Sequence, residues 1–112
     1  MVAPSTGSVT LVPFPFSDLS QSKLRPAIVL ASADRYGWVL CEVTGRPSGD
    51  KRALELRDRD FVIGGQRVCS FARPAKRFTA HQSLFIAEVG KLNRQATDRL
   101  LAAVTRVIQP NA

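Results

Sequence analysis

Histidine, cysteine and the largest aromatic residues are scarce in this chain of 112 residues, and each shortage removes a class of site. His81 is the single histidine, so the paired histidines of many metal-free nucleases cannot be built within one chain. We expect His81 to be a solvated turn residue. The spacing of Cys41 and Cys69 matches no zinc or redox motif, which favours two reduced, buried thiols over an inter-strand disulfide.

Long hydrophobic runs are also missing, and none approaches the ~18 residues that cross a bilayer. Residues 1–7 lack the basic and apolar regions of a signal peptide, and we expect them to form a loose N-terminal tail. We therefore expect a soluble, cytoplasmic protein with no membrane partner. A chain of this length has room for one domain, here residues 1–112, around a single core.

Negative charge is in short supply, with 9 Asp and Glu against 16 Lys and Arg, a net charge of +7 and a pI near 10.5. Twelve of the cations are arginines, whose planar fork suits bidentate phosphate contacts better than the point charge of lysine. This balance favours a polyanionic partner, which can be RNA, DNA or an acidic protein. Charge alone leaves open that the arginines reflect only genomic composition.

Period-two alternation predicts several short strands. Residues 8–12 alternate, and the Pro-Phe-Pro-Phe segment at 13–16 predicts a stiff loop, because its prolines lack ladder donors. The apolar run at 27–31 predicts a central strand buried on both faces. Residues 38–44 alternate again, and Trp38 at their start is expected to anchor either the core or a dimer contact.

Three more strands and one helix are expected further along the chain. The strands are predicted at 52–56, 67–72 and 84–89, with loops between them. From Asn93, a plausible N-cap, apolar residues recur with helical period until Pro110 lies beyond the end. The pattern predicts a mainly β (α+β) fold, a small antiparallel barrel with a C-terminal helix packed over an opening.

Two phosphate-directed groups are expected at one edge of this barrel. Arg25 stands at the entrance of the buried strand, where Pro26 constrains its backbone to extended geometry. Thr44 ends the next strand and shares a side with Glu42, a weaker candidate for orienting Arg25. Their convergence suggests chemistry on nucleic acid. The plainer alternatives are a surface arginine before a strand and a β-branched residue where strands favour one.

Further side chains are candidates for contact with a nucleic acid. Phe14 and Phe16 either stack on bases or pin their loop to the barrel. The cationic candidates for RNA binding are Lys23, Arg46, Arg73 and Lys76.

Taken in order, these segments resemble the MazF/PemK family of toxin endoribonucleases from type II toxin–antitoxin systems. The likeness covers nearly the whole chain, and its order and spacing are more specific than any single piece. It is carried by residues 7–19, 25–30, 43–44, 60–61, 64–65, 70–74, 76, 78–79 and 90–92.

The resemblance implies an SH3-like barrel that forms homodimers and cuts single-stranded RNA without metal or other cofactor. It also implies an acidic antitoxin whose disordered tail covers the RNA groove. By position, the active-site arginine of the family falls on Arg25 and its hydroxyl partner on Thr44. The implied reaction is attack of the RNA 2′-OH on the adjacent phosphorus, which leaves a 2′,3′-cyclic phosphate and a 5′-OH.

This chain departs from the family pattern at two places. Gly45 stands where many members carry a second small hydroxyl, and Pro74-Ala75-Lys76 follow Arg73 where PemK-like members often have an acid. Two rival functions therefore stay open. One is a gyrase-poisoning toxin of the same barrel superfamily, against which the retained arginine and threonine argue. The other is a non-catalytic SH3-like RNA-binding module.

Overall fold

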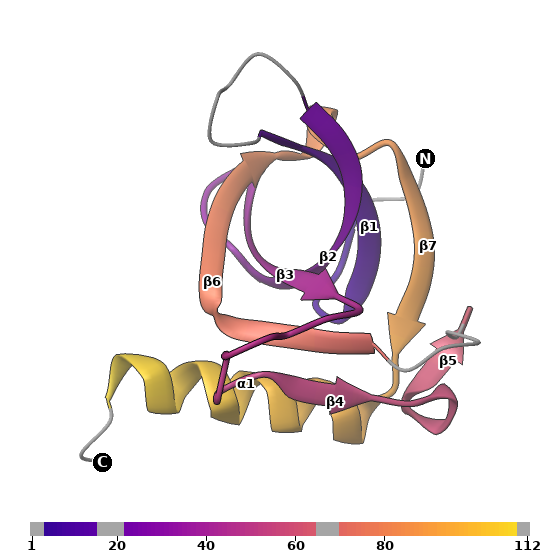
Figure 1. The fold of residues 1–112 in the computed structure, drawn as a ribbon. Coiled ribbons are helices and arrows are strands. Elements are labelled where there is room, and N and C mark those ends of the chain that lie inside the picture. The colour runs from indigo at the N-terminus through magenta and orange to yellow at the C-terminus, as the bar shows by residue number, and fades with distance from the viewer. Residues whose placement is uncertain (1–3, 16–21, 65–69, 110–112) are drawn as a thin grey trace.

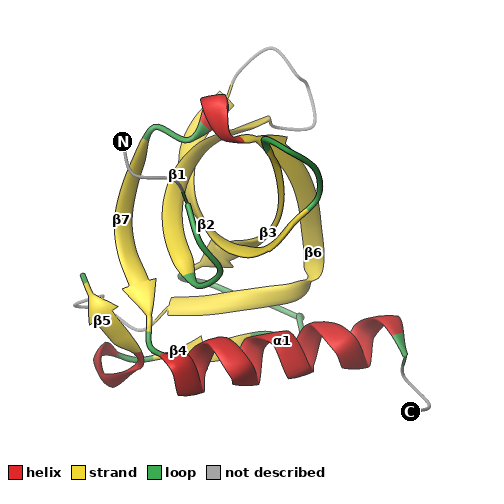
Figure 2. Cartoon of the chain, turned by 180° about the vertical axis from the view of Figure 1, so that it is seen from behind, coloured by secondary structure: helices red, strands yellow, loops and turns green. Residues whose placement is uncertain are grey.

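The computed structural model describes residues 4–15, 22–64 and 70–109. Within these ranges, antiparallel strands form one sheet of seven in the order β4-β6-β3-β2-β1-β7-β5, and the sheet curls into a half-barrel (Figure 1). One helix, α1, runs beneath β4 (Figure 2). The predicted mainly β fold with a C-terminal helix is confirmed. The bounds are β1 Ser8–Pro15, β2 Ser22–Ser32, β3 Gly37–Thr44, β4 Leu54–Leu56, β5 Phe61–Ile63, β6 Ser70–His81, β7 Ala87–Leu92 and α1 Arg94–Ile108.

The first strand is longer than expected, and the prediction of a stiff loop at its proline-rich end was wrong for residues 13–15. β1 continues to Pro15 and pairs with β2 from Val9 to Pro15, whereas its pairing with β7 stops at Leu11. Beyond Leu11, β1 therefore pairs with β2 alone among the described strands, and proline is tolerated on the side of a strand that has no paired neighbour. Phe16 and Cys69 lie outside the described residues.

The largest difference concerns β6, which was expected to end at residue 72 and instead runs for 12 residues to His81. Opposite it, Glu42 pairs with Arg73 while the adjacent Cys41 pairs with Arg77. β6 therefore carries three extra residues, 74–76, in a bulge. Proline is acceptable there because a bulge interrupts the ladder, and the Pro74 ring is fully buried.

The remaining elements follow the prediction with shifted bounds. Two short 3-10 helices, Asp58–Asp60 and Gln82–Leu84, were not expected, and neither was β5. The strand expected at 84–89 begins later, as β7. His81 is exposed, and its Nδ1 accepts a hydrogen bond from the backbone N–H of Ser83 at 3.0 Å. α1 begins as predicted, because the Asn93 side chain accepts a 2.8 Å hydrogen bond from the backbone N–H of Ala96.

The two faces of β2 and β3 pack into two apolar clusters. On one face Ile28 and Cys41 join Leu100 of α1, whereas on the other Val29 and Leu40 join Phe85. The expectation that the run at 27–31 is buried on both faces is therefore confirmed for residues 27–30; Ala31 is exposed. The second cluster is extended by partly buried aromatic residues, Phe14, Trp38 and Phe78. No helix of the described part is long and apolar enough to span a membrane.

The thiol of Cys41 provides a test of this packing. Burial raises the pKa of Cys41 to about 12. In a Cys69→Ser variant, where Cys41 is the sole thiol, we expect a disulfide reagent at pH 8 to label the native protein at least about a hundredfold more slowly than the unfolded chain. Rapid labelling without denaturant would contradict this packing.

The same thiol also predicts a pH dependence. Its folded-state pKa lies above the ordinary value of 9.0, so it leaves the free energy of unfolding unchanged below pH 9. That free energy should fall as the pH rises from 9 toward 12, because the unfolded state then loses the proton more readily. Urea titrations at pH 8 and pH 10 measure the difference, and a Cys41→Ala variant should show a smaller one.

Candidate functional site

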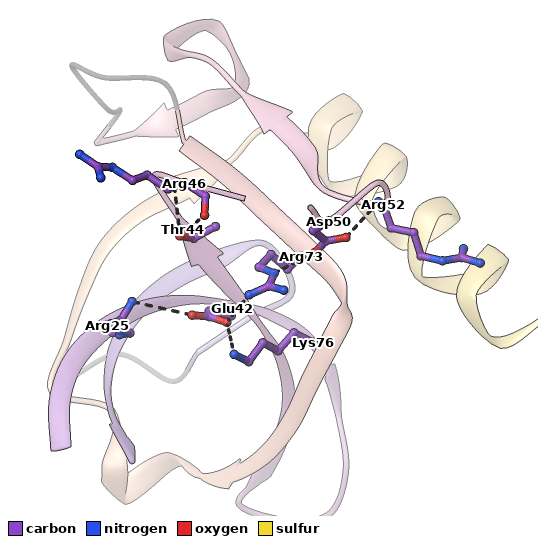
Figure 3. A network of polar contacts seen from close by, with 8 residues as sticks. All are labelled: Arg25, Glu42, Thr44, Arg46, Asp50, Arg52, Arg73 and Lys76. Carbon is purple, nitrogen blue, oxygen red and sulfur yellow. Dashed lines mark hydrogen bonds and ion pairs between the residues drawn. The ribbon is translucent and has the colours of Figure 1, made fainter. Parts of the chain in front are cut away.

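The buried carboxylate of Glu42, near the end of β3, contacts cationic side chains from the two neighbouring strands, β2 and β6 (Figure 3). The Glu42 side chain is 6% exposed, and its Oε1 lies 3.9 Å from Nη1 of Arg25. Its Oε2 lies 3.4 Å from Nη1 of Arg73 and 3.2 Å from Nζ of Lys76. A carboxylate so removed from water needs such partners, because an unpaired buried charge costs several kcal/mol. Glu42 therefore holds three cations in one place.

Strand register explains why Arg25 reaches this carboxylate. The last described pair between β2 and β3 joins Ala27 to Glu42. Alternation places Arg25 on the same face of β2 as Ala27, and Thr44 on the same face of β3 as Glu42. Continuing the register by two residues sets Arg25 across from Thr44. The predicted sharing of one side by Glu42 and Thr44 follows from the same alternation.

The bulge in β6 explains how two of its side chains meet one oxygen. In a regular strand, residues three apart point to opposite faces. Arg73 and Lys76 are three apart, yet both contact Oε2 of Glu42. The extra residues of the bulge reverse the alternation between them, and the buried Pro74 anchors the turn of the backbone.

Thr44 marks the point where β3 gives way to a loop over residues 45–50. Its Oγ1 accepts a 3.2 Å hydrogen bond from the backbone N–H of Arg46 and donates one of 3.4 Å to the carbonyl oxygen of Arg46. The Arg46 side chain is exposed and points away from Glu42 (Figure 3). The hydroxyl of Thr44 is therefore held by the backbone of the loop, two residues along β3 from Glu42, and the charge of Arg46 does not join the three cations.

Asp50 is a member of this network that the sequence did not indicate. Its Oδ2 accepts a 2.8 Å hydrogen bond from Nε of Arg73, and its Oδ1 accepts one of 3.0 Å from the backbone N–H of Arg52. The hydrogen bond from Arg73 lowers the pKa of Asp50, and the same bond raises the pKa of Arg73. The composition of residues 45–50 predicts only a loop, because a Gly-Asp pair carries no signal for a contact with a distant arginine.

A hollow of about 530 Å³ opens beside this network. The loop over 45–50 forms one wall and the bulge of β6 forms the other. Ala75 is exposed there, within the segment Pro74-Ala75-Lys76 where the resemblance led us to expect an acid. The lining residues are Ser48, Gly49, Asp50, Arg73, Ala75 and Lys76.

Other sequence candidates lie elsewhere. Phe14 packs edge-on against Phe78 with ring centroids 4.7 Å apart, beside the apolar cluster of the barrel. Lys23 is exposed near the start of β2. His81 pairs with Gly37 at the far end of the β3–β6 ladder from Thr44. Over residues 4–15, 22–64 and 70–109, no three His, Cys, Asp or Glu side chains are grouped as a metal ion requires.

Comparison with known proteins shows which solved structures share this fold. No protein-family model matches the sequence, and no curated protein does. Among solved structures, an endoribonuclease from a mycobacterial species in complex with its cognate antitoxin is 11% identical, with a TM-score of 0.72 over 97% of this chain and 96% of that chain. MazF in a MazE–MazF complex from Deinococcus radiodurans is 14% identical, with a TM-score of 0.72 over 96% and 97%.

A third similar structure is the Mycobacterium tuberculosis toxin MazF-mt6, at 15% identity and a TM-score of 0.68 over 91% of this chain and 96% of that chain. Identities this low show the fold and not the chemistry. The chain therefore has the fold of the MazF endoribonuclease toxins over nearly its whole length.

Proposed function

We propose that this chain is the toxin of a type II toxin–antitoxin system, a cytoplasmic endoribonuclease that cuts single-stranded RNA at short sequences without a metal ion. The observation that carries the proposal is the meeting of three cationic side chains on the buried Glu42 carboxylate, on the strand that ends at Thr44. The fold shared with MazF endoribonucleases supports it.

The chemistry at this site is attack of a 2′-OH on the adjacent phosphorus through a pentavalent phosphorane. Negative charge grows on the non-bridging oxygens, and fixed donors aimed at them lower the barrier. Arg25 supplies a guanidinium for this charge. The Thr44 hydroxyl exchanges its weak 3.4 Å hydrogen bond to the Arg46 carbonyl for one to a non-bridging oxygen. A guanidinium with a pKa above about 12 is a poor base near neutral pH, so Arg25 acts by charge.

The other cations extend the site along the RNA. Arg73 and Lys76 line the hollow beside the loop over 45–50, where a neighbouring phosphate or nucleotide fits. Lys23 and the side chain of Arg46 are exposed and serve as outer backbone contacts. Such contacts make affinity for RNA fall as salt rises.

A direct test incubates the purified protein with a long RNA in EDTA and maps the new ends by primer extension. We expect cuts at one recurrent short motif, with 2′,3′-cyclic phosphate and 5′-OH ends. RNA that is bound but left intact would favour the non-catalytic binding module. Intact RNA together with inhibition of gyrase supercoiling would favour the gyrase-poisoning toxin.

The proposed partners are a second copy of this chain and an acidic antitoxin. The antitoxin is supported by the net charge of +7 and by similar structures solved as toxin–antitoxin complexes. We expect a short acidic reading frame immediately upstream of the gene. Co-expression of its product should suppress RNA cleavage, and light scattering of the purified toxin should give twice the chain mass.

Gly45 offers a gain-of-function prediction. A Cβ placed on Gly45 meets no atom within 4 Å, so Gly45→Ser should change the free energy of unfolding by less than about 0.5 kcal/mol. The new hydroxyl restores a hydrogen-bond donor beside Thr44. One hydrogen bond is worth about 0.5–1.5 kcal/mol, so the cleavage rate should rise about two- to tenfold.

The matched control is Gly49→Ser in the same loop. Gly49 has φ of +79°, in the left-handed region that L side chains disfavour, so this change should destabilise by about 1 kcal/mol. Urea titrations and initial cleavage rates on one RNA separate the two effects. A Gly45→Ser rate equal to or below that of wild type would show that position 45 does not face the RNA.

A further inference from the structure

We propose that Lys76 is the proton donor to the departing 5′ oxygen and that Glu42 positions it for this role. The proposal rests on the endoribonuclease function proposed above and goes beyond it, because Arg25 and Thr44 stabilise charge but leave proton delivery unassigned. The observation behind it is the contact of 3.2 Å between Nζ of Lys76 and Oε2 of Glu42, at the edge of the open hollow.

The 2′-OH loses its proton to hydroxide or water from the solvent, and its oxygen forms a bond to phosphorus. The bond from phosphorus to the 5′ oxygen then breaks, and the oxygen leaves with the electron pair. Nζ of Lys76 gives this oxygen a proton, so a neutral alcohol departs, and the amine afterwards regains a proton from water.

The other described groups at the site suit this task less well. An ammonium group ordinarily has a pKa near 10.4, about two units or more below that of a guanidinium, so it releases a proton more readily. Arg73 is a still weaker acid than an ordinary arginine, because its hydrogen bond to Asp50 raises its pKa. We therefore assign Arg25 and Arg73 to the stabilisation of negative charge and not to proton transfer.

The histidine and the described cysteine lie out of reach. His81 pairs with Gly37, five residues along β3 from Glu42, which is roughly 16 Å at about 3.3 Å per residue. The Cys41 thiol belongs to the apolar cluster on the opposite face of β3. Of the three cations that contact Glu42, Lys76 is therefore the one with the most readily transferable proton.

The exposed fractions of Lys76 and Glu42 also suit a proton donor that is held at one end and open to RNA at the other. The Lys76 side chain is 51% exposed, whereas the Glu42 side chain that holds it is 6% exposed. One end of the contact is thus fixed inside the protein while the ammonium faces the hollow. The bulge over residues 74–76 is what turns this lysine toward the site, because regular alternation would place Arg73 and Lys76 on opposite faces.

The decisive experiment compares Lys76→Arg with wild type on a short RNA that contains the cleavage motif mapped in long RNA. Arginine keeps the positive charge and can still pair with Glu42, but it is a poor proton donor. We expect kcat to fall about 10²- to 10³-fold, in the range of general acid catalysis, with KM within about threefold of wild type. Lys91→Arg on β7, outside this site, is the matched control and should keep wild-type kinetics.

A second substrate separates proton donation from a structural role. The same RNA is made with sulfur in place of the bridging 5′ oxygen at the scissile bond, because a thiolate leaves without needing a proton. We expect Lys76→Arg to cleave this RNA within about tenfold of wild type. A deficit as large as that on the oxygen substrate, or an unimpaired Lys76→Arg on the oxygen substrate, would overturn the proposal. A wild type that leaves the long RNA intact would overturn the proposed function itself.

Discussion

Replacing Arg25 with alanine should reduce RNA cleavage by about 10²- to 10³-fold, the loss expected when one fixed donor to a developing oxyanion is removed. The loss should fall on kcat, because the guanidinium acts on charge that exists in the transition state. Arg25→Lys should recover part of the rate, since it restores the charge without the planar fork. Single-turnover rates on one labelled RNA measure each variant.

The matched control for this substitution is Arg94→Ala. Arg94 lies at the start of α1, its side chain is 94% exposed, and its ion pair with Asp98 is long, at 4.0 Å. Arg94→Ala lowers the net charge by the same amount as Arg25→Ala. Because Arg94 lies outside the site, we expect this variant to change cleavage by less than about twofold. Equal losses in the two variants would mean that the net charge, and not the placement of Arg25, governs activity.

The Glu42→Gln variant should show the second large effect, a loss of stability together with a loss of rate. Glutamine keeps the shape of the side chain but removes the negative charge that Arg25 and Lys76 contact, whereas Arg73 keeps its ion pair with Asp50. Removal of a fully buried partner costs about 3–5 kcal/mol. Because these cations are 28–51% exposed and can regain water, we expect about 1–3 kcal/mol in urea titrations.

The kinetic signature of Glu42→Gln should differ from that of a loss of folding. The variant carries one more net positive charge, so its affinity for RNA at low salt should be equal to or higher than that of wild type. Its kcat should nevertheless fall, since Arg25 and Lys76 lose the group that positions them. The Asp98→Asn variant, with an exposed partner, is the control and should change stability by less than about 0.5 kcal/mol.

Much of the fold could be predicted from the sequence, because its signals were local. The uninterrupted apolar run around Ile28 predicted a strand between two apolar layers, and both layers are present. The Asn93 cap and the helical spacing of Ala96 and Leu100 predicted α1. Alternation over 38–44 placed Glu42 and Thr44 on one side, which is the part of the candidate site that strand geometry determines.

The parts that could not be predicted depend on contacts between distant segments. Pro13 is compatible with a strand because β1 has a paired strand on one side only at this point, and Pro74 is compatible because it lies in a bulge. The residues next to each proline do not predict either situation. The contact between Asp50 and Arg73 joins residues 23 apart in the chain. The gathering of cations by Glu42 depends on the bulge, which period-two reasoning cannot detect.

The most direct test of the central claim changes the RNA at a single atom. A motif-containing RNA is made with hydrogen in place of the 2′-OH on the nucleotide before the scissile bond, and it is incubated with wild-type protein in EDTA beside the unmodified RNA. If the site uses the neighbouring 2′ oxygen as nucleophile, the modified RNA should bind with similar affinity and remain intact. Cleavage at the modified bond would show that the nucleophile comes from elsewhere, and the chemistry assigned to Arg25, Thr44 and Lys76 would be wrong.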